Sequence, residues 1–248
     1  MIELISRSTA LENDVFATFI HNWQQRFDPR IDPYMTEPGI YYDNLTDQDR
    51  FYTGEEINKI RQEEVEEFER RSDPIMPGKF EYTGELLYCL PYTDIIVYAI
   101  EIGKVLENLS AYTNAKTTFL LDYRIPWLHQ QNEYPPVNSA LNYLREEGVS
   151  EDFVGGIRAD GKRLEELSKN LFWIIRCNAS LPYCWFSCGY ESFVGNICKH
   201  GNIHLYTYGE AVKEKLIAFA SQNGLIEIKE CLQGFTDSRS IDGRELLV

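Results

Sequence analysis

The stretch that decides the fold is "YCWFSCGYESFVGNICKHGNIHLYTY", residues 183–208. At its start, Cys184 and Cys188 stand four positions apart with Trp, Phe and Ser between them, and the alternation is typical of a strand with one buried face. Residues 202–208 alternate in the same way, and residues 171–180 form an apolar run directly before the stretch. We therefore predict three consecutive strands of an antiparallel meander, at 171–180, 183–188 and 202–208.

The same stretch contains side chains that could bind a metal ion. These are Cys184, Cys188, Cys198, His200 and His204. Two thiolates on one zinc ion must lie within about 4 Å of each other, whereas four residues of strand span about 13 Å. Cys184 and Cys188 are therefore predicted to be core residues, and no cofactor is predicted. If a metal ion is bound, the expected ligands are Cys198, His200, His204 and one further residue.

The remaining elements follow from hydrophobic period and capping residues. A first helix is predicted to start at a capping box of Thr9 and Glu12 and to end before the prolines of 27–33. Residues 34–54 show no period and predict a loop, and Thr53 with Glu56 predicts the capping box of a second helix. Further helices are expected at 94–110, 138–148, 161–170 and 210–224, strands at 84–92, 116–125 and 225–230, and a plain turn within 153–162.

These elements predict an α+β fold. The sheet is expected to be mixed or mainly antiparallel and flanked by helices, with a helical segment at the N-terminus. The 248 residues are expected to form one domain. Within it, residues 1–80 would be a helical acidic part and residues 81–248 an α/β core.

Charge is the strongest global signal. The net charge is −15, and residues 1–160 carry all of it, because 29 acidic residues there face 14 basic ones. Such a chain repels nucleic acid and anionic membranes, and it attracts a basic protein. The N-terminus has no secretory pattern and the longest apolar run, 95–100, is too short to span a bilayer. We therefore expect a cytoplasmic protein with reduced thiols.

Aromatic and acidic side chains are interleaved in the 34–52 loop. Tyrosine is enriched among binding hot spots, and carboxylates beside it would meet arginine or lysine. The alternative is that these aromatics only pack the loop against the body. The predicted partner-binding residues are Tyr41, Tyr42, Asp43, Asp47, Asp49, Tyr52, Glu56, Glu63 and Glu67.

No nucleophile elbow, dinucleotide fingerprint or phosphate-binding loop is present, so we do not predict an enzyme. In size, acidity and lack of catalytic motifs, the chain resembles the immunity proteins of bacterial contact-dependent inhibition and other polymorphic toxin systems. The resemblance implies a protein that occludes the active site of a basic nuclease toxin. The alternative is a small α/β hydrolase or metal-dependent enzyme that uses the cluster at 177–204, with Cys177 or Cys188 beside His200 or His204.

Overall fold

A large antiparallel sheet organises the molecule. The computed structural model describes residues 2–31, 33–43, 46–92, 94–129, 133–176 and 183–231. In spatial order, the strands of the large sheet are β1 (Glu3–Ile5), β6 (Gly156–Ala159), β5 (Thr117–Leu121), β7 (Cys184–Cys188), β8 (Phe193–Ile197), β9 (Ile203–Tyr208), β4 (Tyr82–Cys89) and β10 (Ile226–Glu227). Every neighbouring pair is antiparallel. The α+β prediction and its mainly antiparallel sheet are confirmed.

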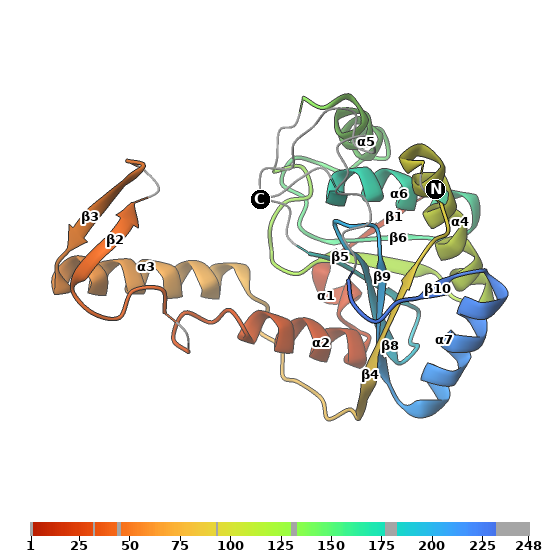
Figure 1. Cartoon of the computed structure of the whole chain (residues 1–248), viewed down its shortest axis with the longest axis horizontal. Helices are drawn as coiled ribbons and strands as arrows, with labels where there is room; N and C mark the ends of the chain where they lie inside the picture. Colours follow the sequence, from red (N-terminus) through yellow and green to blue (C-terminus); the bar gives the residue numbers. More distant parts are fainter. Residues whose placement is uncertain are drawn as a thin grey trace.

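Helices cover both faces of this sheet. The helices are α1 (Arg7–Ala10), α2 (Asp14–Gln25), α3 (Gly54–Arg71), α4 (Ile95–Thr113), α5 (Pro135–Glu146), α6 (Gly161–Arg176) and α7 (Glu210–Gln222). One face packs against α4, α6 and their neighbours α5 and α7, and this side holds the larger core. The other face packs against α1 and α2 over a smaller core (Figure 1).

The central strand β7 is buried along its whole length. Cys184 and Cys188 point into the larger core, and Trp185 points to the opposite side, where its ring lies 4.6 Å from that of Phe19 in α2. The prediction that both cysteines are core residues is confirmed. Burial raises the pKa of the Cys188 thiol to about 12, which keeps it protonated at neutral pH.

The strands that form the meander differ from those predicted. Residues 171–176 are not a strand but the last turns of α6, and β8 is the middle strand that the prediction lacked. Leu164, Leu167 and Leu171 are fully buried at helical spacing, so packing against α4 extends the helix through the β-branched and aromatic residues that suggested a strand. Residues 177–180 lie outside the described residues.

The N-terminal predictions also need correction. Thr9 lies inside the short α1, and the cap of the long helix is Asn13, whose side chain accepts a hydrogen bond from the Phe16 N–H. Strand β1 precedes both helices and pairs with β6, which occupies the predicted turn at 153–162. Residues 34–52 are not an irregular loop, because they contain the hairpin of β2 (Gly39–Asp43) and β3 (Gln48–Tyr52).

Several helix predictions are confirmed. Thr53 and Glu56 form the capping box of α3. The segment predicted as a helix at 94–110 is helical, and Asp94 caps it by accepting from the N–H groups of Ile96 and Val97. These caps satisfy N–H groups that a helix start otherwise leaves without partners.

Gly195 is required by the close packing of β8 against β7. A Cβ atom at this position would overlap the ring of Phe186, which is itself fully buried. We expect Gly195→Ala to lower the free energy of unfolding by about 1–3 kcal/mol, as overpacking of a core does. Gly54→Ala, whose Cβ would meet only Pro38 at 3.6 Å, is the control and should change stability by less than about 1 kcal/mol in urea unfolding. Equal effects of the two variants would contradict this account of the sheet.

Candidate functional site

A segment of the acidic N-terminal part forms an arm that extends from the sheet. We use "the arm" for the described residues of 33–73, which comprise the β2–β3 hairpin and α3 (Figure 1). Met35, Tyr52 and Ile57 form its own small core. Of the 18 residues of α3, only Ile57 and Phe68 are buried. Most of the arm's surface therefore faces solvent.

The outer side of the hairpin is apolar and exposed. Ile40 pairs with Phe51 across the two strands, and Tyr42 pairs with Asp49, so these four side chains share one side of the hairpin. Ile40, Phe51 and Tyr42 are 71%, 59% and 45% exposed. We call this group of Ile40, Tyr42, Asp49 and Phe51 the hairpin face. Contiguous exposed apolar side chains of this kind mark interaction sites more often than isolated ones do.

The structure separates the residues predicted to bind a partner in the hairpin. Tyr42, Asp47 and Asp49 are exposed, and the Tyr42 hydroxyl donates to the Asp47 carboxylate. Asp43 and Tyr52 are each only 7% exposed, and their side chains support the hairpin from inside. Tyr41 is half-buried against the same small core, so Tyr42 is the tyrosine of this set that faces solvent.

The predicted acidic residues of α3 are engaged by basic neighbours. Glu56 forms an ion pair with Arg50, and Glu67 forms ion pairs with both Arg70 and Arg71. The Oε1 atom of Glu63 lies 3.7 Å from Nζ of Lys59. Hydrogen bonds from Arg70 are the main reason why the pKa of Glu67 is lowered. Among the described residues, the exposed or half-exposed acids of the arm that form no ion pair are Glu37, Asp47, Asp49, Glu55, Glu64 and Glu66. The arm's outward negative charge therefore comes mainly from acids other than the three predicted in α3.

A buried ion pair joins the arm to the body. Arg7 donates from Nε and Nη2 to the two carboxylate oxygens of Asp73, at 2.7 Å each, and both side chains are nearly inaccessible. Gln24 of α2 donates to the same carboxylate and accepts from the Asp73 N–H. The Arg124 N–H donates to the last carbonyl of α3, that of Arg71. These contacts set the position at which α3 leaves the sheet.

Asp122 lies beside this junction, just after β5. Its Oδ2 accepts from the indole N–H of Trp23 at 3.2 Å, while Arg7 bonds its carbonyl oxygen. Burial raises the pKa of the carboxyl group to about 7, with partial compensation from the Trp23 hydrogen bond. Its charged form is thus unfavourable at the base of the arm.

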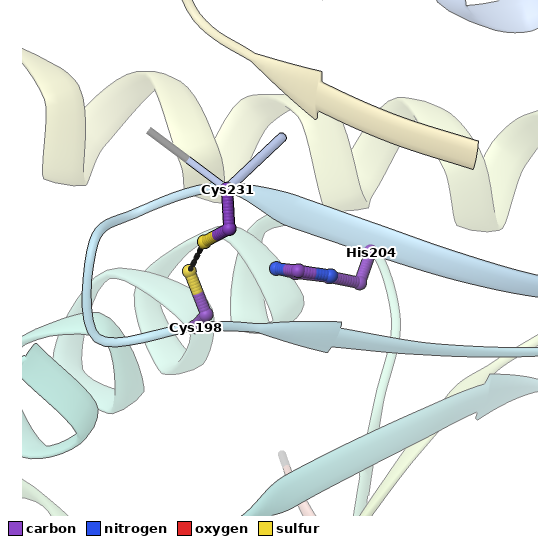
Figure 2. Close-up of side chains that lie close together, drawn as sticks. All are labelled: Cys198, His204 and Cys231. Carbon is purple, nitrogen blue, oxygen red and sulfur yellow. Dashed lines mark hydrogen bonds between the residues drawn. The ribbon is translucent and has the colours of Figure 1, made fainter. Parts of the chain in front are cut away.

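Cys198, His204 and Cys231 form a second cluster (Figure 2). Their ligand atoms all lie within 4.8 Å of one another, and the two sulfurs are 3.6 Å apart. Burial raises the pKa of the Cys198 thiol, and the neighbouring Cys231 adds to the shift. His200, which belonged to the predicted conditional set, is not a member of this group.

Of the alternative catalytic pairs, Cys188 with His204 is not assembled in the structure. Cys188 points into the larger core, and so do Ile203 and Leu205 of β9. His204 lies between these two residues along the strand, so its side chain points to the other face. Cys188 and His204 therefore lie on opposite faces of the sheet. Cys177 lies outside the described residues.

Comparisons of the chain with protein-family models, curated proteins and solved structures find no match. Within the described part of the chain, no helix combines the length and the apolar character that crossing a bilayer requires.

Sequence reasoning missed four residues of these two sites. Ile40 and Phe51 belong to the hairpin face. The sequence signal for them is that residues 39–43 and 48–52 are two segments of equal length separated by four residues, as in a hairpin. Glu85 contacts His204 from the neighbouring strand β4. Cys231 is 27 positions beyond His204, and no local spacing connects the two.

The raised pKa of Asp122 predicts a stability change with pH. Because its pKa is raised above the unfolded value of 3.8 to about 7, the folded state holds an extra proton between these pH values. Stability from this group is therefore greatest below about pH 4, falls by up to about 4 kcal/mol as the pH rises to about 7, and stays constant above that. Asp122→Asn should flatten this dependence in urea unfolding between pH 5 and pH 8. Equal pH slopes for the wild type and Asp122→Asn would contradict it.

Proposed function

We propose that this chain is an acidic cytoplasmic binding protein that neutralises a basic protein, and that the arm is its binding surface. In its most specific form, the proposal is an immunity protein that occludes the active site of a nuclease toxin. The observation that carries it is the exposed apolar hairpin face on an acidic projection. Residues 33–73 hold 12 acidic and 5 basic side chains, a net charge of −7.

The chemistry of the arm suits a cationic protein cleft. Apolar and aromatic side chains supply most of the affinity in such contacts, so Ile40, Tyr42 and Phe51 would be the anchors. Carboxylates around them would attract the partner and orient it, which mainly affects the association rate. A nuclease cleft is basic because it binds phosphates, and acidic side chains in that cleft would exclude its substrate.

The proposal predicts that the neighbouring reading frame encodes a secreted protein that ends in a basic domain, and the test uses that domain as the probe. We expect a nanomolar complex that suppresses the nuclease activity of that domain at equal concentrations. A triple variant, Ile40→Ala with Tyr42→Ala and Phe51→Ala, should weaken the complex at least about 100-fold in calorimetry, mainly through faster dissociation. Asp47→Asn with Asp49→Asn should slow association about tenfold at low salt and reduce its salt dependence.

Matched controls lie away from the arm. Tyr190 is 80% exposed, so Tyr190→Ala removes an exposed ring without touching the hairpin. Glu146→Gln with Glu214→Gln also removes two negative charges, but from exposed positions on α5 and α7. Both controls should leave affinity within about twofold, as surface changes outside an interface do. Absence of a complex at low salt, or equal losses in arm and control variants, would refute the proposal.

A further inference from the structure

We propose that Cys198, His204 and Cys231 bind a zinc ion. The three side chains come from separate parts of the chain, namely the position after β8, the second residue of β9 and the segment after β10. Their ligand atoms converge at one point, as Figure 2 shows. The proposal concerns a site outside the arm and does not rest on the function proposed for the arm.

The separation of the two sulfurs fits shared coordination. Two thiolates bound to one tetrahedral zinc at about 2.3 Å lie about 3.8 Å apart. The Cys198 and Cys231 sulfurs are 3.6 Å apart, so a zinc ion would need little movement of either side chain. Asn202 donates its side-chain amide to the Cys231 sulfur at 3.2 Å, which suits a thiolate acceptor.

His204 is oriented as a metal ligand would be. Its Nδ1 lies 2.5 Å from Oε1 of Glu85 on the neighbouring strand. A proton on Nδ1 leaves a lone pair on Nε2, the arrangement of a carboxylate–histidine–zinc triad. Nε2 is buried and has no hydrogen-bond partner among the described residues. The ring edge that carries a nitrogen points toward the two sulfurs (Figure 2). A bound cation would satisfy this nitrogen, and a buried polar atom without a partner costs about 1–3 kcal/mol.

The donor set selects the ion. Thiolate and imidazole favour zinc over magnesium or calcium, which prefer oxygen ligands. Three protein ligands leave the fourth position of a tetrahedral zinc to water or an external ligand. Zinc must displace the protons from both thiols, so its affinity should rise with pH.

The site would also fasten an edge of the sheet. Strand β10 consists of only two residues, Ile226 and Glu227, and both are exposed. Beyond it, the Ile228 N–H donates to the Leu87 carbonyl before the chain reaches Cys231. A metal shared with Cys198 and His204 would join this lightly packed segment to β8 and β9.

The test measures metal in the full chain purified under reducing conditions from zinc-supplemented medium. We expect one zinc per chain by elemental analysis, and Co²⁺ should give the intense visible d–d bands of a tetrahedral site together with a sulfur-to-cobalt charge-transfer band in the near ultraviolet. Cys198→Ser, Cys231→Ser and His204→Gln should each lose the stoichiometric metal. Glu85→Gln should bind zinc about 10–100-fold more weakly, because it changes only the partner of the histidine.

Cys89→Ser is the matched control, since Cys89 is a half-buried thiol of β4 outside the cluster. It should keep the metal, and circular dichroism should show a folded chain for every variant. No zinc or cobalt bound to the reduced wild type would overturn the proposal, and so would full retention of the metal in both Cys198→Ser and Cys231→Ser. The proposal would also be overturned if the purified chain contained a Cys198–Cys231 disulfide, detected by mass spectrometry as a loss of two hydrogens, and bound no metal after that disulfide was reduced.

Discussion

The buried ion pair between Arg7 and Asp73 is the interaction on which the shape of the molecule depends. Both side chains are shielded from water, and two parallel hydrogen bonds of 2.7 Å join them. Arg7 belongs to α1, which lies against the sheet, and Asp73 follows the last turn of α3. Because α3 buries only two of its own side chains, hydrophobic packing along the helix contributes little to holding it. Its direction is therefore set largely by the charge network at its end.

Two separate surfaces follow from this architecture. The sheet is covered on both faces, so most side chains of its central strands lie in the two cores. The arm lies outside that core and carries exposed apolar and acidic side chains on the hairpin and on α3. The cluster of Cys198, His204 and Cys231 lies where the turn between β8 and β9 meets the segment after β10. Binding of a partner and binding of a metal would thus use different parts of the chain.

Local signals predicted what depends on local physics. The Thr53 and Glu56 capping box, the Asp94 helix and the burial of Cys184 and Cys188 follow from side-chain period and hydrogen bonding over a few residues. The errors arose where tertiary packing decides. Residues 171–176 carry β-branched and aromatic side chains that favour a strand, yet contact with α4 keeps them helical. In the hairpin, apolar residues occur on both sides of β2, which hides the alternation of a strand.

The candidate sites show the same limit. That Asp47 and Asp49 are exposed could be expected from their charge, but local sequence could not show that Glu67 is paired with two arginines. Cys231 joins Cys198 and His204 only because β10 pairs with β4 at the far edge of the sheet. Contacts of this kind depend on strand order, which no spacing of residues encodes.

The central claim is that a buried charge pair fixes the arm to the sheet, and a double-mutant cycle on Arg7 and Asp73 tests it most directly. The free energy of unfolding would be measured for the wild type, Arg7→Met, Asp73→Ala and the double variant. Removing one partner leaves the other charge buried without a counter-ion, so each single variant should lose about 3–5 kcal/mol of unfolding free energy. The double variant should lose clearly less than the sum of the two single losses. We expect a coupling energy of about 2–3 kcal/mol. A coupling energy within about 0.5 kcal/mol of zero would contradict the account.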